Sequence, residues 1–309
     1  MSKTAFIFAG QGAQYIGMGQ DFAKEYETAN KIFDSADNAL GFSIKDLIFN
    51  SNDEKLKITE NTQPSILTTS VAILNVIMEN GIKPDIVAGL SLGEYTAHVA
   101  AGTISFEEAV KLVRKRGKFM QEAVPIGVGT MAAIIGLEKE DVIECCNISK
   151  SLGVVEPANF NCPGQIVIAG EVKAVEAAVE KAKEKGSKRA MILPVSAPFH
   201  CSLLKKAGEN LSKELETIEF KNMNIPVVSN VTGDFIEDKN QIKDLLIKQV
   251  SSSVLWLDGF RKMIDFGVDT FIEIGPGKVL SGFNRKIDRK MRSFNIEDIP
   301  SMEKTISKI

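Results

Sequence analysis

The stretch Ile86-Val87-Ala88-Gly89-Leu90-Ser91-Leu92-Gly93-Glu94-Tyr95 decides the fold of this chain. A short apolar run, then Gly-x-Ser-x-Gly, then a helix-compatible segment predicts a strand, a sharp turn and a helix with Ser91 at the apex, an arrangement known as a nucleophile elbow. Glycines flank the serine because a Cβ beside it would clash where the chain comes close. The helix would direct its first N–H groups at whatever Ser91 attacks, which stabilises an oxyanion. Ser91 is therefore a candidate nucleophile, although Gly-x-Ser-x-Gly also occurs by chance in glycine-rich chains.

Composition describes an ordinary globular chain. It has 309 residues, of which 44% are hydrophobic and 25% charged, and a formal net charge of −3, which gives no basic footprint for nucleic acid or an anionic membrane. The apolar run at residues 4–9 is too short for a signal peptide, and no run reaches membrane-spanning length, so we expect a cytoplasmic protein. Four cysteines without a C-x-x-C pair and only two histidines predict no metal site, and we expect no cofactor.

The segment before the elbow predicts a parallel sheet. Residues 4–9 read as a buried strand, followed by the loop Gly10-Gln11-Gly12-Ala13-Gln14, which could bring backbone N–H groups against a ligand but lacks a dinucleotide fingerprint. A tight strand-to-helix turn is the alternative interpretation. Residues 21–80 look helical, with a polar break around residues 50–60 and a new helix starting near residues 62–65. Strand–helix–strand order gives parallel strands, with ligands at their carboxyl ends.

A cation stands on the apolar face of the helix predicted at residues 106–121. At 3.6 residues per turn, Arg116 falls among the apolar residues while its basic neighbours face away. Burying such a charge alone would cost several kcal/mol. Arg116 therefore either forms an internal salt bridge or lies above Ser91 and binds a substrate carboxylate through two parallel hydrogen bonds.

Residues 131–195 follow a β-α-β-β-α-β order, typical of a ferredoxin-like subdomain. We expect it to be inserted at residues 128–195, between the two segments, 1–127 and 196–309, of an α/β-hydrolase-like catalytic domain. Residues 159–164 are predicted to form the turn between its middle strands. The strands are expected at residues 131–135, 154–160, 165–169 and 189–195, and the helices at residues 139–150 and 172–185.

Histidine supplies the base that a serine nucleophile needs, and the chain has only His98 and His200. His98 lies seven residues beyond Ser91 on the predicted helix, about 10 Å along its axis and out of hydrogen-bonding range. His200 follows the strand that re-enters the catalytic domain. A lone histidine is more often structural, but His200 is the remaining candidate base.

An acidic third member of a triad is hard to identify. Between the candidate nucleophile and base the only aspartate is Asp141, on a predicted surface helix, and no glutamate stands at an obvious strand end. The sequence therefore favours a dyad in which His200 is oriented by a neutral acceptor.

These features together resemble the bacterial malonyl-CoA:acyl carrier protein transacylase family. Several independent motifs in one order make the resemblance more specific than the elbow alone. They are Gly10-Gln11-Gly12-Ala13-Gln14, Gly89-Leu90-Ser91-Leu92-Gly93-Glu94-Tyr95, Arg116-Gly117-Lys118-Phe119-Met120, Asn159-Phe160-Asn161, Ala197-Pro198-Phe199-His200, Gln249 with Val254-Leu255-Trp256, and Glu273-Ile274-Gly275-Pro276-Gly277-Lys278.

The resemblance implies a transferase in fatty acid synthesis and assigns the site. Malonyl-CoA would acylate Ser91, His200 would act as base and then acid, and the backbone carbonyl of Gln249 would orient His200. The partner in the second step would be the phosphopantetheine thiol of holo acyl carrier protein, and we expect a monomer. The remaining roles are an oxyanion hole from the N–H groups of Gln11 and Leu92, and substrate contacts from Arg116, Asn161 and Phe199.

Two positions depart from the family pattern. Leu90 stands where many relatives have histidine, and Ser253 where proline commonly precedes the valine, so we expect a looser loop after Gln249. Phe199 beside His200 resembles the pattern that selects malonyl over methylmalonyl.

Other functions remain open from the sequence. The same elbow would suit a serine thioesterase or esterase, which water would discharge, and the chain could be a non-catalytic docking module or a trans-acting acyltransferase for polyketide synthesis. Intact Ser91, His200 and Arg116 argue against the non-catalytic version. Lys188, Arg189 and Arg285 could meet an acidic carrier protein, although solvated surface charge is the more common role.

Overall fold

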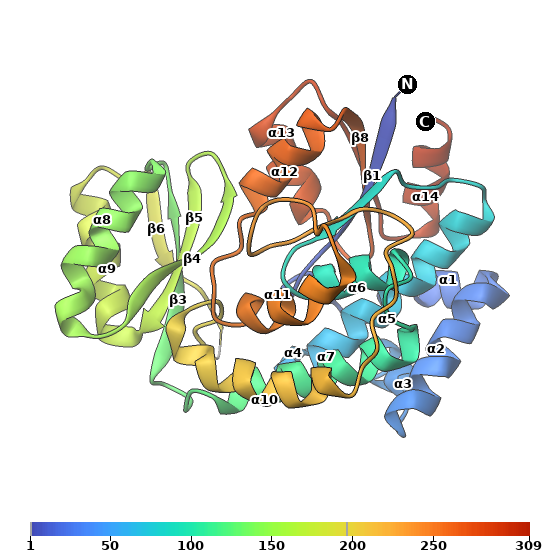
Figure 1. Cartoon of the computed structure of the whole chain (residues 1–309), viewed down its shortest axis with the longest axis horizontal. Coiled ribbons are helices and arrows are strands. Elements are labelled where there is room, and N and C mark those ends of the chain that lie inside the picture. Colours follow the sequence, from blue (N-terminus) through green and yellow to red (C-terminus); the bar gives the residue numbers. More distant parts are fainter. Residues whose placement is uncertain (1, 196) are drawn as a thin grey trace.

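The computed structural model describes residues 2–195 and 197–309; Ser196, at the predicted domain boundary, lies outside the described residues, as does Met1. Two sheets organise the molecule, and Figure 1 shows them at either side of the view. Sheet A is parallel throughout, as predicted. Its strands, in spatial order, are β7 (Val227–Val228), β2 (Ile86–Gly89), β1 (Lys3–Phe8), β8 (Val268–Ile274) and β9 (Arg292–Ile296).

Helices cover both faces of sheet A, because successive side chains along each strand point to opposite faces and both sets are apolar. Phe6 and Phe8 pack on one face with the core of the N-terminal helices, while Ala5 and Ile7 pack on the other with the C-terminal helices. The first group contains α1 (Gln20–Glu25), α2 (Glu27–Leu40), α5 (Thr59–Glu79), α6 (Leu92–Ala100) and α7 (Phe106–Glu122), and the second contains α12 (Trp256–Asp265) and α13 (Val279–Ile287).

The helical region before the elbow differs in detail from the prediction. Helix α3 (Ile44–Phe49) precedes the predicted polar break, but α4 (Asp53–Lys57) lies inside it, capped by the Asn52 side chain, and α5 begins at Thr59. Asparagine at a helix start accepts a backbone N–H, so a polar stretch can hold a short helix rather than a loop. Helix α5 is buried along most of its length, packed beside α2 and α7.

Sheet B has the strand order β4–β5–β3–β6, antiparallel throughout, which confirms the ferredoxin-like prediction. Helices α8 and α9 pack with Ala132 and Ile168 on one face, while Met131 and Ala169 on the other face join the main core. The bounds are β3 (Gly129–Ile135), α8 (Lys139–Ser149), η1 (Lys150–Leu152), β4 (Val155–Cys162), β5 (Gln165–Glu171), α9 (Val172–Glu184) and β6 (Arg189–Ile192).

The predicted turn at residues 159–164 is wrong in extent. Asn159 and Asn161 belong to β4, and only Pro163 and Gly164 lie between the paired strands. The strand continues because its outer edge has a partner outside sheet B: Phe160 N–H donates to Val254 O (2.9 Å), and Val254 N–H donates to Ala158 O (2.8 Å). A paired edge satisfies backbone groups that a turn would otherwise leave to solvent.

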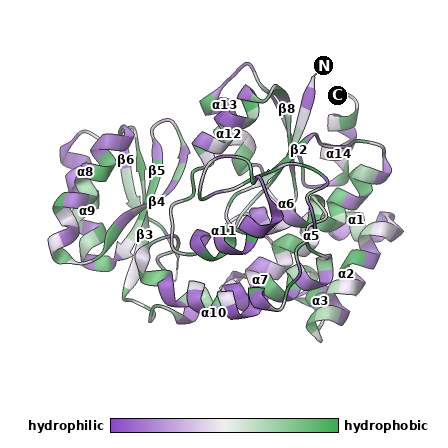
Figure 2. Cartoon of the chain, viewed as in Figure 1, coloured by the Kyte–Doolittle hydropathy of each residue, from purple (hydrophilic) through white to green (hydrophobic). Residues whose placement is uncertain are grey.

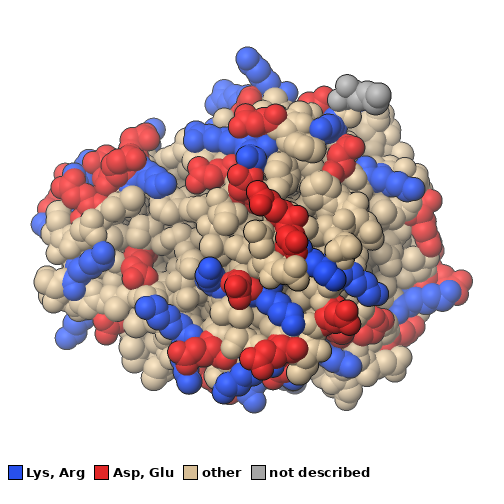
Figure 3. Space-filling view, in the orientation of Figure 1, with Lys and Arg blue, Asp and Glu red and all other residues tan. Residues whose placement is uncertain are grey.

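Figure 2 shows both hydrophilic and hydrophobic residues along the peripheral helices, as amphipathic packing requires, and Figure 3 shows positive and negative side chains interspersed on the same face. None of the described helices is long and apolar enough to cross a membrane. The remaining elements are η2 (Ser202–Leu204), α10 (Lys205–Glu216), η3 (Lys239–Gln241), α11 (Ile242–Gln249) and α14 (Ile299–Ile306).

Candidate active site

Ser91 occupies the sharp turn between β2 and α6, as predicted. Its φ of 54° and ψ of −104° are strained for a residue with a side chain. A Cβ on Gly89 would lie 1.9 Å from the Gly93 carbonyl carbon, and one on Gly93 would lie 2.0 Å from Phe8 O. Both flanking glycines are therefore required sterically, and the turn presents the serine side chain at the carboxyl edge of sheet A.

His200 joins Ser91 to Gln249. Its Nε2 lies 2.7 Å from Ser91 Oγ and its Nδ1 lies 2.8 Å from the backbone carbonyl oxygen of Gln249. A carbonyl can only accept, so Nδ1 carries the proton and Nε2 is left to accept from the serine hydroxyl. Burial, reinforced by the positive charge of Arg116, lowers the pKa of His200 to about 4. The imidazole is therefore neutral near pH 7 and able to act as a base.

Arg116 is buried beside the nucleophile. Its Nη2 donates to Ser91 Oγ at 3.1 Å and to the side-chain oxygen of Gln249 at 2.9 Å, and Nη1 donates to Gln63 Oε1 at 2.8 Å. No carboxylate among the residues that the structure describes lies within 4 Å of the guanidinium, so the internal salt bridge is not formed. Burial lowers its pKa. A buried cation whose partners are neutral can accept an anionic ligand.

Two buried polar side chains that sequence reasoning missed support these groups. Asn230 Oδ1 accepts from Ser91 N–H (2.6 Å), and Asn230 Nδ2 donates to Gly89 O (2.7 Å). One side-chain amide therefore holds both the end of β2 and the serine at the turn. Glu94 accepts from Gln249 Nε2 (2.6 Å) and from Asn230 N–H (3.1 Å). Asn230 follows β7, the strand beside β2, and the rule that ligands gather at strand ends could have identified it.

The predicted oxyanion-hole residues come from neighbouring strands. Leu92 is the first residue of α6, so its N–H has no acceptor within the helix. Gln11 follows β1, whose Phe8 is in register with Gly89. A Cβ on Gly10 would lie 2.5 Å from Leu90 O, which shows how closely the two loops approach. The contribution of both N–H groups to one oxyanion hole stays a prediction.

The remaining predicted residues are buried. Phe199 precedes the base and is 8% exposed, and Asn161 on β4 is 6% exposed with no hydrogen-bond partner for its Oδ1 in the described structure. Their contacts with substrate stay predictions. His98 instead bonds Thr103 Oγ1 through Nδ1 (3.0 Å), which fits the structural role left to it.

The loop after Gln249 is held by a side-chain hydrogen bond and by pairing with β4. Ser253 Oγ donates to Pro157 O at 2.6 Å, and Val254 pairs with β4. These bonds restrain the segment, and the looser loop stays a prediction.

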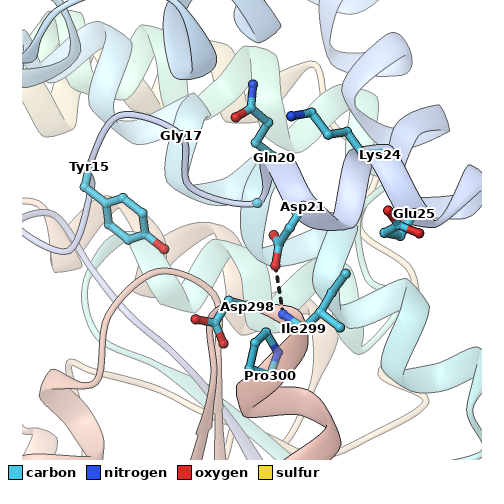
Figure 4. A pocket seen from close by; sticks show the side chains of 10 residues that line it. Tyr15, Gly17, Gln20, Asp21, Lys24, Glu25, Asp298, Ile299 and Pro300 are labelled. Carbon is cyan, nitrogen blue, oxygen red and sulfur yellow. Dashed lines mark hydrogen bonds between the residues drawn. The ribbon is translucent and has the colours of Figure 1, made fainter.

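A cavity of about 430 Å³ between the N-terminal loop and α14 is not part of this site. Its two aspartates accept hydrogen bonds from backbone groups: Asp21 accepts from Ile299 N–H (2.8 Å), drawn as the dashed line in Figure 4, and Asp298 accepts from Ser301 N–H. None of the residues lining it belongs to the Ser91 site. No group of three or more His, Cys, Asp or Glu side chains suited to a metal occurs in the described ranges.

Alanine at Gly117 is expected to lower the free energy of unfolding by about 1–3 kcal/mol, because its Cβ would lie 2.6 Å from Thr59 O, where α7 crosses the start of α5. Urea denaturation measures this. Gly282→Ala in α13 is the matched control: its Cβ meets nothing within 4 Å, so the variant should be as stable as the wild type or slightly more so. Equal losses in both variants would show that close packing at position 117 is not the cause.

Comparisons with known proteins cover nearly the whole chain. The family profile described as “Acyl transferase domain” matches residues 5–304, a range that includes Ser91, Arg116, His200 and Gln249. A malonyl CoA-acyl carrier protein transacylase of Bacillus subtilis (strain 168) is 48% identical over 307 residues, which is 99% of this chain and 97% of that protein.

Solved structures also superpose closely on this chain. A malonyl CoA-acyl carrier protein transacylase from Clostridium perfringens superposes with a TM-score of 0.97 at 50% identity, covering 99% of this chain and 97% of that one. A malonyl-transacylase in complex with a holo type II PKS acyl-carrier protein superposes with a TM-score of 0.97 at 40% identity, covering 100% of both chains.

Proposed function

The chain belongs to the acyl transferase domain family, and from that premise we propose that it moves a malonyl group from coenzyme A to the phosphopantetheine thiol of acyl carrier protein through an ester on Ser91. The observation that carries this proposal is the position of Arg116, a buried cation 3.1 Å from an activated serine and without a carboxylate partner. A cation there would bind the free carboxylate of malonyl while its thioester faces the nucleophile.

The acylation step uses His200 as base. The Ser91 hydroxyl gives its proton to Nε2 as Oγ attacks the thioester carbonyl carbon, and the Gln11 and Leu92 N–H groups receive the developing oxyanion. The tetrahedral intermediate collapses when the C–S bond breaks, and the coenzyme A sulfur leaves with the proton from His200. The Gln249 carbonyl holds the imidazole in the tautomer that this needs.

The second half-reaction reverses these roles with a different thiol. The carrier thiol gives its proton to His200 and attacks the Ser91 ester, and Oγ leaves with that proton. A covalent intermediate shared by both halves predicts ping-pong kinetics. Fatty acid synthesis and polyketide synthesis use the same chemistry here and differ in the carrier protein.

Three further features are part of this proposal. We place the protein in the cytoplasm, supported by four cysteines that are all buried and unpaired. We assign residues 1–127 and 196–309 to the catalytic domain and residues 128–195 to the inserted subdomain. Phe199 and Asn161 would line the acyl pocket.

The test is the intact mass of the protein after brief mixing with malonyl-CoA. We expect a malonyl adduct that persists in buffer and is discharged by holo acyl carrier protein. Free malonate without an adduct would favour a thioesterase, the second candidate that the elbow supports. No reaction with malonyl-CoA would overturn the proposal.

The Phe199 ring is expected to make malonyl-CoA a better substrate than methylmalonyl-CoA by about 10- to 200-fold in kcat/KM, because one extra methyl in a tight pocket costs about 1–3 kcal/mol. Competition between the two thioesters measures the ratio. Phe199→Ala should bring the ratio toward one. Comparable kcat/KM values in the unaltered protein would contradict the assignment.

A further inference from the structure

Glu94 is a buried carboxylate next to the acyl site to which the reaction above gives no role. It lies in the first turn of α6 and is fully buried. Its Oε2 accepts from the Gln249 side chain and from Asn230 N–H, while Oε1 has no hydrogen-bond partner in the described structure. A carboxylate with one oxygen unsatisfied is held in the interior at a cost that needs a compensating charge.

The compensating charge is Arg116, reached through the Gln249 amide. Arg116 Nη2 donates to Gln249 Oε1 (2.9 Å), and Gln249 Nε2 donates to Glu94 Oε2 (2.6 Å), so the two ends of one amide face a cation and an anion. The same amide nitrogen also donates to Ser91 O (3.0 Å). Without substrate, the buried charges of the pocket are thus balanced across a single neutral side chain.

A malonyl carboxylate on Arg116 would place a second anion in this network. We propose that Glu94 is the resting counter-charge of Arg116 and takes up one proton from solvent when a carboxylate-bearing acyl group binds the guanidinium. This rests on the proposed role of Arg116. The pocket then keeps the same net charge with and without malonyl, and an acyl group without a carboxylate takes up no proton.

Burial raises the pKa of Glu94 to about 7, against the opposing effects of the Gln249 and Asn230 hydrogen bonds and of Arg116. A nearby anion raises it further, because like charge disfavours the ionised form. The affinity for malonyl-CoA is therefore highest below about pH 7, the pKa of Glu94 in the free protein. It falls as pH rises from there toward the higher pKa of Glu94 in the complex.

Three neighbouring groups with shifted pKa values, Tyr95, His98 and His200, do not change charge in this range. On α6 itself, burial raises the pKa of Tyr95 to about 12 and lowers that of His98 to about 3, and the pKa of His200 is about 4. Helix α7 contributes Arg116, which stays protonated. The packed strands β2 and β7 have no titratable residue; Lys3 begins β1, and Glu60 and Glu79 lie at the ends of α5.

Calorimetry with Ser91→Ala measures the proton directly, because this variant can bind malonyl-CoA without reacting. Titrations at pH 7.5 in phosphate and in Tris, whose ionisation enthalpies differ, should give an uptake of up to one proton for malonyl-CoA and none for acetyl-CoA. If malonyl-CoA binds more tightly than acetyl-CoA but without proton uptake, only the proposed role of Glu94 is overturned. Equal affinity for the two thioesters would instead overturn the proposed Arg116 contact.

The pH profile of Glu94→Gln gives the second measurement. For release of coenzyme A in a single turnover, wild-type kcat/KM for malonyl-CoA should fall on the order of tenfold between pH 6.5 and 8.5, while acetyl-CoA shows no such fall. Glu94→Gln should remove the fall. Glu273→Gln is the matched control, because this buried glutamate accepts from the N–H groups of Leu280 and Ser281 instead, and it should keep the wild-type profile. An unchanged profile in Glu94→Gln would refute the proposal, and the calorimetry decides it if that variant does not fold.

Discussion

Alanine at position 91 is expected to remove the malonyl adduct completely and to lower transfer by at least about 10³-fold. The reason is that Oγ is both the atom acylated and the partner of His200 Nε2, at 2.7 Å, and alanine leaves no atom to attack the thioester. Intact-mass analysis after mixing with malonyl-CoA and a radiolabel transfer assay measure the two effects. The fold should be unchanged, because the elbow is held through the backbone N–H of residue 91 and Asn230.

Ser253→Ala is the control for this prediction. Its hydroxyl bonds Pro157 O near the same loop, but it has no contact with His200 among the described residues, so the variant should still form the adduct. An adduct of equal mass on Ser91→Ala would contradict the assignment and would point to another nucleophile.

Replacing Arg116 by alanine is expected to lower kcat/KM for malonyl-CoA by about 10²–10³-fold, the loss typical of removing one member of a buried charged hydrogen-bonded pair. Acetyl-CoA, which has no carboxylate, should lose far less and so gain relative to malonyl-CoA. Single-turnover kinetics with both thioesters give the ratio.

Two variants separate the carboxylate contact from a general effect of charge. Arg116→Lys keeps the charge but cannot form two parallel bonds, so malonyl preference should recover only in part. Arg114→Ala removes a guanidinium on the same helix that packs over Phe42, and it should leave the preference unchanged. Unaltered malonyl preference in Arg116→Ala would refute the carboxylate contact.

Local patterns in the sequence predict much of this site. The elbow follows from glycines that flank Ser91 between an apolar run and a helical segment, and the position of Arg116 follows from helical periodicity alone. His200 follows by elimination, because the chain offers only one other histidine. The ferredoxin-like unit follows from six consecutive segments whose types are each clear locally.

What the residues alone did not predict is long-range. Gln249 orients His200 through a backbone carbonyl, which every residue has, so only resemblance to a family could assign it. Asn230 lies 139 residues from Ser91, from whose N–H it accepts a hydrogen bond, and Glu94, although it is next to the elbow, meets its partners Asn230 and Gln249 only through the fold. The prediction of a turn at residues 159–164 was wrong for the same reason, because β4 continues there by pairing with Val254, which is distant in the sequence.

The parallel bridge between β4 and Val254 constrains how this protein can be re-engineered. Val254, which pairs with the outer edge of β4, lies five residues after Gln249, so the two parts of the chain share backbone hydrogen bonds close to the residue that orients the base. A chimaera that exchanges residues 128–195 for another ferredoxin-like module must therefore reproduce the register of Asn159 with Val254. A graft chosen for its acyl pocket alone would shift the imidazole as well, and substrate range and turnover would change together.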